Sequence, residues 1–349
     1  MRIDRIAFDE RAVVFLGAGA TRGASFVEKK KGALLPPLDA DFFTQAQRLS
    51  KDKPASLVAE LIENVVETFG SNFTLTMEGY LTRLEHLANV YEDYKLRGRP
   101  GTNKYRAMRD QFRQVLAAVL DESIDGKELC DYHHRLLDVM ANQDTIVSFN
   151  YDCLIDLTLK KWGKDKWNPR TGYGVPVYAR GEKGAGTRHW AYPESDKKEY
   201  PKHSITLLKL HGSINWFTVP KDKNFSRLKL RQRWWHQQGD LHFEIAPPEW
   251  NKPIRSGIYK RIWQKARAAL KEVKALVFIG YSLPETDLPA QALLMVNSQD
   301  NPEPLELLVT VNPDQQARRR IRQSLQKRMG SKTRVLSFER FSDFADFLG

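Results

Sequence analysis

Polar residues and glycines follow four apolar runs of the sequence, at the point where each run ends. Side chains of these types could bind a ligand, orient a water molecule or transfer a proton. Each has a structural explanation when taken alone, because Asn and Asp cap helices, Gly permits tight turns and a single His is usually structural. Together they indicate one functional site. The four segments are Asn150 with Tyr151 and Asp152, His211 with Gly212 and Ser213, residues 280–287, and Asn312 with Pro313 and Asp314.

A glycine-rich turn closes the first apolar run and adds a fifth segment. The residues at 13–16 predict a buried strand, and Gly17, Gly19 and Gly23 follow it. Glycines at such a point let backbone N–H groups approach a ligand, usually a phosphate. A tight turn that binds nothing is the alternative, and this segment alone does not separate the two.

The turn departs from the motif of ordinary dehydrogenases. Its spacing is G-x-G-x-x-x-G, one residue longer than the usual dinucleotide fingerprint. The acidic residues about twenty positions further on, Asp39 and Asp41, follow two prolines and not a second strand. A dehydrogenase is therefore disfavoured.

Seven short apolar runs form the framework that must position these residues. Buried strands that alternate with helices form parallel sheets covered on both faces, and their ligands lie beyond the carboxyl ends of the strands. We predict an α/β fold, a Rossmann-like parallel sheet of about six or seven strands with helices on both faces, plus a helical insertion and an irregular small subdomain. The runs are residues 13–16, 145–149, 206–210, 241–245, 275–279, 305–311 and 334–338.

We predict one domain over residues 1–349, interrupted by three insertions. The stretch 41–142 is predicted to be a helical insertion, because leucines recur within it at helical spacing. Residues 162–203 and 218–240 are predicted to be loop-rich. A tryptophan pair at 234–235 could stack on a base, but packing or a partner contact is the favoured interpretation.

The composition restricts the class of protein. A hydrophobic content of 41% provides a core, and two cysteines cannot form a four-thiolate zinc site or a disulfide framework. The charged N-terminal residues do not form a signal peptide, and no apolar run approaches the ~20 residues of a membrane span. We expect a cytoplasmic protein without a membrane partner.

The net charge of +12 favours an anionic substrate or another polyanion. The densest basic cluster, residues 317–328, is predicted to be a helix with one buried face and one solvated face. Direct nucleic-acid binding stays open, but no recognised nucleic-acid motif supports it.

In their order along the chain, the five segments resemble the sirtuin family, in its bacterial, defence-associated sirtuin-like branch without the zinc module. In that family a glycine turn is followed by an Asn-x-Asp segment, a strand ending in His-Gly, a Gly-x-Ser segment and a strand ending in Asn. The stretches HGSINW, PPEW and IGYSLPETD are similar to those of sirtuin-like domains of antiphage defence. The matching positions are Gly17, Ala18, Gly19, Ala20, Thr21, Asn150, Tyr151, Asp152, His211, Gly212, Gly280, Tyr281, Ser282 and Asn312.

Two departures separate the sequence from the deacetylases of that family. The four-cysteine zinc module that usually follows the His-Gly strand is absent from the sequence, and Ser148, Phe149 and Asn150 stand where deacetylases carry Thr-Gln-Asn. Both changes fall near the acyl-peptide side of the site and leave the NAD side intact. The resemblance therefore implies cleavage of NAD⁺ at the nicotinamide–ribose bond with water as acceptor, with NAD⁺ as substrate and no zinc or other metal.

The resemblance also implies roles for individual residues. Asn150 would orient the attacking water or the ribose hydroxyls, and His211 would act as general base. Asp152 would bind the nicotinamide amide or stabilise developing charge. Asp287 is predicted from its position to cap a helix, although the resemblance places it near the site. Arg22 is left between a phosphate contact and a surface salt bridge. The predicted binding residues are Gly17, Ala18, Gly19, Ala20 and Thr21 for the pyrophosphate, and Gly280, Ser282 and Asn312 for phosphate and the adenosine ribose.

Two other functions are compatible with the same NAD site. One is a protein deacylase or ADP-ribosyltransferase, and the other is a non-catalytic sensor of NAD⁺ or ADP-ribose that regulates a partner. An unrestrained NAD⁺ hydrolase would kill its host, so we expect a gate. The resemblance implies an effector of antiphage defence that acts by abortive infection, as a homo-oligomer or with an ATPase, helicase or nuclease partner.

Overall fold

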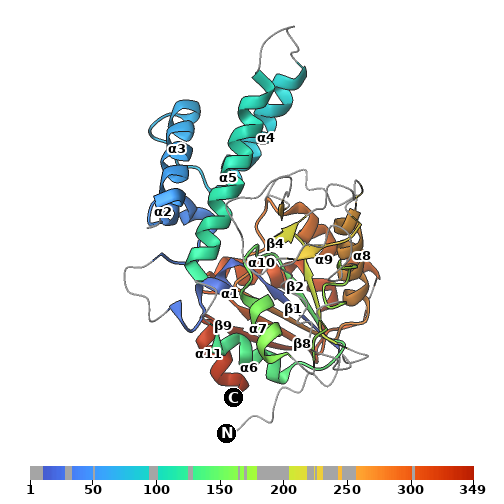
Figure 1. The fold of residues 1–349 in the computed structure, drawn as a ribbon. Helices are drawn as coiled ribbons and strands as arrows, with labels where there is room; N and C mark the ends of the chain where they lie inside the picture. Colours follow the sequence, from blue (N-terminus) through green and yellow to red (C-terminus); the bar gives the residue numbers. More distant parts are fainter. Residues whose placement is uncertain are drawn as a thin grey trace.

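The computed structural model describes most of the chain (Figure 1). The described residues are 11–27, 34–49, 52–93, 101–124, 129–163, 166–168, 171–178, 204–217, 224, 226–230, 243–245, 257–300 and 303–349. Most of the predicted loop-rich insertions, including the tryptophan pair at 234–235, lie outside these residues.

A six-stranded sheet forms the centre of the molecule, and every neighbouring pair of its strands is parallel. Its strand order is β3-β2-β1-β7-β8-β9. The direction of winding reverses between β1 and β7, which is the point where ligands of such sheets bind. This confirms the predicted Rossmann-like fold. The strands are β1 (Ala12–Leu16), β2 (Thr145–Ser148), β3 (Thr206–Lys209), β7 (Ala275–Ile279), β8 (Leu307–Val311) and β9 (Arg334–Phe338).

The continuous apolar runs become central strands because both faces of the sheet are covered. All residues of β1, β2, β7 and β8 are buried. The edge strand β9 is partly exposed: its polar residues Arg334 and Ser337 are exposed, and its apolar residues are partly buried. Phe15 of β1 stacks on Phe278 of β7 with ring centroids 4.5 Å apart, which adds to the packing between the two central strands.

The register of the sheet brings the carboxyl ends of its strands into one row. Each strand pairs with its neighbour up to its last residue, so the segments that follow leave the sheet at the same edge. The predicted site residues therefore start from one edge of the sheet. The last residues are Lys209, Ser148, Leu16, Ile279, Val311 and Phe338.

Helices cover both faces of the sheet (Figure 1). In one layer α6 packs against α7 and α11, and in the other α9 packs against α8 and α10. A short 3₁₀ turn, η3 (Gln326–Arg328), follows α10. The helices are α6 (Asp131–Val139), α7 (Leu154–Trp162), α8 (Gly257–Lys271), α9 (Leu288–Asp300), α10 (Gln315–Ser324) and α11 (Phe341–Leu348).

The chain between β1 and β2 contains a group of helices with its own core. Helices α4 and α5 pack side by side and rise beyond the sheet in Figure 1. Phe42, Tyr80 and Phe112 are fully buried among them, and Leu81 and Leu84 are buried as their helical spacing predicted. The elements of this group are η2 (Asp39–Asp41), α2 (Phe42–Ala46), α3 (Asp52–Phe69), α4 (Met77–Asp93) and α5 (Gly101–Ile124). The short helix α1 (Ala18–Arg22) precedes the group, and its Ala20 packs in the core of the central sheet.

A second, three-stranded antiparallel sheet differs from the prediction. It consists of β4 (Gly212–Phe217), β5 (Lys229–Leu230) and β6 (Phe243–Ile245) in the order β5-β4-β6. The run at 241–245 therefore does not join the parallel sheet. Its polar–apolar alternation is typical of a strand with one covered face, whereas the central strands are continuous apolar runs.

Strand β4 was not predicted, because its residues were interpreted as the end of the preceding run. Gly212 has a φ of +80°, a conformation that favours glycine, and it redirects the chain from β3 into β4. Among the described residues no helix is long and apolar enough to cross a membrane.

Candidate functional site

A cavity of about 860 Å³ lies beyond the carboxyl ends of the strands, at the switch point between β1 and β7. Its volume is in the range of small-molecule sites. Ten of the eleven predicted site residues line it, so the structure brings the strand ends together as expected. They are Gly17, Ala18, Gly19, Thr21, Asn150, Asp152, His211, Gly280, Ser282 and Asn312.

Ala20 is the predicted site residue that does not line the cavity. It is fully buried in α1, and its N–H donates to the carbonyl oxygen of Gly17 at 2.9 Å. Ala20 therefore contributes to the packing of the turn, and nothing in its contacts indicates a direct contact with a ligand.

The glycines after β1 serve the approach of one backbone segment to another. A Cβ atom on Gly17 would lie 2.5 Å from the carbonyl oxygen of Gly280, and one on Gly19 would lie 2.7 Å from the Gly280 Cα. Gly280 has a φ of +62°, and a Cβ there would overlap the backbone of Gly19 and Ala20. The turns after β1 and β7 thus interlock through glycines.

Several N–H groups of this turn are already used within the protein. Gly17 N–H donates to the carbonyl oxygen of Ile279 at 3.0 Å, and Gly19 N–H donates to that of Gly280 at 2.9 Å. The prediction that these glycines expose N–H groups to a phosphate is therefore not supported at Gly17 and Gly19. Both glycines line the cavity, and their contact with a ligand stays a prediction.

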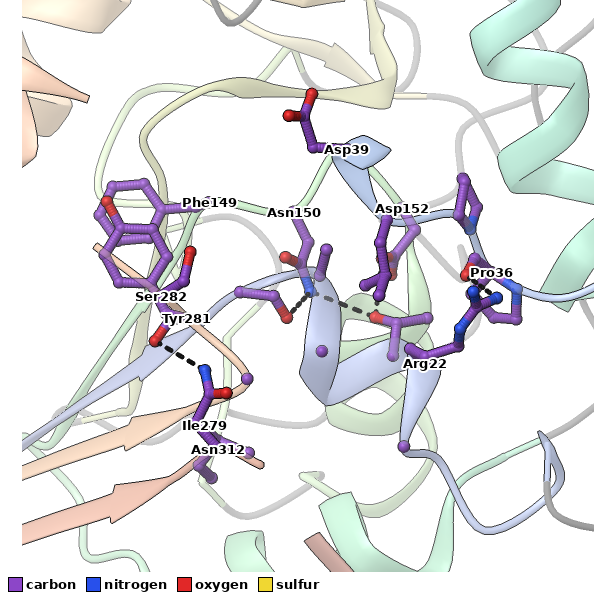
Figure 2. Close-up of a pocket in the computed structure, with 18 of the residues that line it drawn as sticks. Arg22, Pro36, Asp39, Phe149, Asn150, Asp152, Ile279, Tyr281, Ser282 and Asn312 are labelled. Atoms are coloured by element: carbon purple, nitrogen blue, oxygen red, sulfur yellow. Dashed lines mark hydrogen bonds between the residues drawn. The ribbon is translucent and has the colours of Figure 1, made fainter. Parts of the chain in front are cut away.

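Asn150 follows β2 and reaches across to the glycine turn. Its Nδ2 donates to the carbonyl oxygen of Gly17 at 2.9 Å and to the hydroxyl of Thr21 at 3.1 Å (Figure 2). Both amide protons are therefore used in fixing the side chain. Its Oδ1 is buried and has no hydrogen-bond partner among the described residues. Because an unpaired buried acceptor is costly, this atom indicates a missing donor from a ligand or water.

Asp152 is held by the protein at both carboxylate oxygens. Oδ2 accepts from the hydroxyl of Thr21 at 2.8 Å, and Oδ1 accepts from the N–H of Leu154 at 2.9 Å, at the start of α7. The carbonyl oxygen of Asp152 also accepts from Nζ of Lys209. These contacts make Asp152 a residue that positions Thr21 and the loop after β2.

Lys209 and Asp156 form a fully buried ion pair below this loop, at 2.8 Å. The hydroxyl of Tyr173 donates to the other oxygen of Asp156 at 2.6 Å. Burial lowers the pKa of Lys209, but the neighbouring carboxylate of Asp156 outweighs it, and the net pKa is raised. The lysine therefore stays charged and anchors the loop that carries Asn150.

His211 lies in the turn between β3 and β4, packed among aromatic rings. The rings of Phe149 and Tyr281 stack with centroids 4.0 Å apart, and His211 meets Phe149 edge to face at 5.2 Å. Figure 2 shows the stacked pair beside Asn150. The Nε2 atom of His211 lies 3.6 Å from Oδ2 of Asp287, an ion-pair distance when the imidazole is protonated.

Ser282 and Asn312 line the cavity beyond β7 and β8, and side chains of the basic helix α10 bind their backbone carbonyl groups. Nδ2 of Asn312 donates to the carbonyl oxygen of Tyr281 at 3.3 Å (Figure 2). Arg320 donates to the carbonyl oxygen of Ser282 at 3.1 Å, and Arg318 donates to that of Asn312. Part of the basic cluster at 317–328 therefore supports the site.

One wall of the cavity was not predicted. Residues from the segment before α2 and from α4 and α5 face the strand ends, and these are mainly apolar. Arg22 donates to the carbonyl oxygen of Pro36 at 2.9 Å and pairs with Asp41, which ties this wall to α1 (Figure 2). The salt bridge predicted as one alternative for Arg22 is present, and because Arg22 also lines the cavity, its phosphate contact stays a prediction. The wall residues are Pro36, Pro37, Leu38, Asp39, Ala40, Met77, Glu78, Leu116 and Leu120.

A model of the SIR2-like domain family matches residues 144–332, more than half of the chain. The chain belongs to this family. The matched range includes Asn150, His211, Gly280 and Asn312, and it starts after the glycine turn. The predicted sirtuin-like resemblance is confirmed at this level.

Solved structures of Sir2 homologues are also similar to this chain. A mutant Sir2 homologue bound to 2′-O-acetyl ADP ribose has 11% identity and a TM-score of 0.43, with 97% of this chain and 90% of that chain covered. A Sir2 homologue bound to NAD has 11% identity and a TM-score of 0.40, with 97% and 88% covered. No curated protein matches the chain significantly. The family assignment rests on the domain match alone.

Proposed function

We propose that the protein hydrolyses NAD⁺ to nicotinamide and ADP-ribose at this cavity. Membership of the SIR2-like domain family supports a dinucleotide at the strand ends. The observation that carries the proposal is the buried, unpaired Oδ1 of Asn150, fixed in place by its own amide protons. An acceptor held in this way suits a hydroxyl of the ribose or an attacking water.

The chemistry requires little acid catalysis. Nicotinamide leaves as a neutral base from a cationic pyridinium, and the transition state is oxocarbenium-like, as in glycoside hydrolysis. The site must therefore fix geometry and remove a proton from water. Asn150 orients the water or the ribose, and His211 accepts the proton that the water loses when its oxygen bonds to C1′.

The surroundings of the site support water over an acyl peptide as the acceptor. Phe149 replaces the Gln of the deacetylase pattern, and its ring is packed between those of Tyr281 and His211.

The proposal is tested by chromatography of NAD⁺ incubated with the purified protein and its variants. We expect nicotinamide and ADP-ribose from the parent, and a loss of about 10²-fold or more in turnover for Asn150→Ala and His211→Ala. His86→Ala is the matched control, because His86 is exposed on α4 and does not line the cavity. Parental turnover by His211→Ala would contradict the assigned base. NAD⁺ binding without cleavage would support the sensor function instead.

We also propose that the hydrolase acts in antiphage defence and is held inactive until triggered. The support is the toxicity of free NAD⁺ hydrolysis together with the stretch IGYSLPETD, which is similar to defence-associated members of the family. A homo-oligomer, or a partner ATPase, helicase or nuclease, would supply the gate. Light scattering of the parent before and after activation would test the oligomeric alternative.

A further inference from the structure

Asp287 occupies a position that helix capping does not explain. It precedes α9 and is 2% exposed, and its carbonyl oxygen accepts from the N–H of Gln291. Its side chain points elsewhere, because Oδ2 accepts from the hydroxyl of Tyr281 at 2.8 Å. Burial, reinforced by the Asp287 carboxylate, raises the pKa of Tyr281 well above its ordinary value, so the phenol stays a donor. The carboxylate is thereby aimed into the cavity.

The same oxygen of Asp287 lies 3.6 Å from Nε2 of His211. The two residues come from loops after β7 and β3, and β1 and β2 lie between these strands in the sheet. The two loops together therefore span two strand ends to bring the carboxylate to the imidazole. Such a long reach for a buried charge indicates a specific partner.

The backbone of the loop at 280–287 is strained at Leu283. Leu283 is buried and has a φ of +47°, which is rare for a side chain of this size. Strain of this kind persists only where several contacts hold the chain, and it gathers at functional sites. Here Nε2 of Gln291 donates to the carbonyl oxygen of Pro284 at 2.8 Å, and Thr286 donates to Glu78 of α4 at 2.7 Å.

We propose that Asp287 is a positioning residue for His211: it orients the imidazole and compensates the charge that the imidazole gains during the reaction. This inference rests on the proposed function of the site. When the oxygen of the attacking water bonds to C1′, the electron pair of the C1′–N bond goes to nicotinamide, and the proton of the water goes to His211. The imidazolium then faces the carboxylate of Asp287, and its proton later passes to solvent. The 3.6 Å between Nε2 and Oδ2 is longer than a hydrogen bond. We expect this distance to shorten when bound substrate aligns the two side chains.

The test is a double-mutant cycle measured by NAD⁺ turnover. Asp287→Asn keeps the shape and the acceptor for Tyr281, and we expect it to lower kcat about 10- to 100-fold with KM changed less than about threefold. In a His211→Ala background the same change should have almost no further effect, because the residue acts through the imidazole. Glu285→Gln is the matched control, since it removes one charge from an exposed position of the same loop outside the cavity.

Parental kcat in Asp287→Asn would overturn the inference, and so would equal losses in the two backgrounds. If Asp287→Asn fails to fold, the pair Asp287→Glu and Asp287→Gln replaces it. The Glu variant should then keep at least about threefold higher kcat than the Gln variant, and equal values would overturn the inference.

A second readout separates this inference from the proposed hydrolase. The readout is the imidazole ¹⁵N NMR signals of His211, recorded without NAD⁺. They are assigned by their loss in His211→Ala. We expect these signals to shift in Asp287→Asn but not in Glu285→Gln. If the parent shows no NAD⁺ cleavage, the proposed function fails. Unchanged imidazole signals in Asp287→Asn would overturn the inference whatever the activity.

Discussion

At the level of single residues, the site depends on contacts that leave no room for a Cβ atom. The turns after β1 and β7 approach each other closely, and position 280 requires glycine for two reasons. Its φ is positive, and the backbone of Gly19 and Ala20 occupies the space of a Cβ atom. The side chains that we propose to be catalytic, Asn150 and His211, lie on the neighbouring turns after β2 and β3. A small change in the turns should therefore act on stability and activity together.

We expect Gly280→Ala to destabilise the protein by about 3 kcal/mol or more, because overpacking against backbone adds to the strain of a positive φ. Gly70→Ala is the matched control. Gly70 has a φ of +89° with nothing within 4 Å of an added Cβ, so only the conformational cost of about 1 kcal/mol applies. Urea unfolding of both variants measures the difference, and equal losses would contradict the interlocked turns.

The sequence predicts which residues gather at the site better than it predicts what each one does. Polar residues after apolar runs identified Asn150, Asp152 and His211, because parallel strands end at one edge. Hydrogen-bond partners could not be foreseen. Thr21 and Leu154 donate hydrogen bonds to the two carboxylate oxygens of Asp152. The side-chain oxygen of Asn150 has no partner among the described residues. Only the folded structure shows this difference between Asp152 and Asn150.

At the level of elements, continuous apolar runs were sufficient to predict the central sheet. Each of its six strands lies within a predicted run, to within two residues at the ends. The antiparallel sheet was missed because β4 continues directly from the turn after β3, and no break in composition separates them. The amino ends of the central strands carry a further feature, a buried carboxyl group.

Asp144 joins the starts of β1 and β2. Its Oδ1 accepts from the N–H of Ala12 at 2.9 Å, and its Oδ2 accepts from that of Ala141 at 2.7 Å. Burial raises the pKa of Asp144 to about 6, although these two N–H groups and Lys166 oppose the shift. An unfolded Asp has a pKa of about 3.9. Between about pH 4 and pH 6 the folded state therefore binds more protons than the unfolded state, and stability falls as the pH rises.

We expect this carboxyl group to remove up to about 3 kcal/mol of stability between about pH 4 and pH 6, with no further change above. Asp144→Asn abolishes the titration, while its amide leaves one backbone N–H without an acceptor at a constant cost of about 1–3 kcal/mol. The free energy of unfolding of the parent, minus that of the variant, should thus become smaller as the pH rises from about 4.5 to about 6.5, the range around the folded pKa. Urea unfolding at several pH values measures it, and a difference independent of pH would contradict the assignment.

At the level of the whole molecule, helices α4 and α5 of the group between β1 and β2 form part of the site. Leucines at helical spacing predicted that these helices pack together, but nothing in that pattern placed α4 and α5 against the strand ends. The connection is polar: Glu78 of α4 accepts from Thr286 at 2.7 Å, and its N–H donates to Asp39 at 2.8 Å. The helical group is thereby joined to the loop that carries Asp287.

This connection predicts that the helical group controls access to the cavity. Thr286→Val keeps the shape of the side chain and removes the hydroxyl that Glu78 accepts. We expect hydrogen exchange in the first turns of α4 to accelerate, and KM for NAD⁺ to rise about threefold to tenfold, because a looser wall binds substrate less well (about 0.7–1.4 kcal/mol). Thr68→Val on α3, outside the cavity lining, is the matched control. Unchanged exchange in α4 would show that the wall is held by its apolar contacts alone, and the proposed control of access through Thr286 and Glu78 would be wrong.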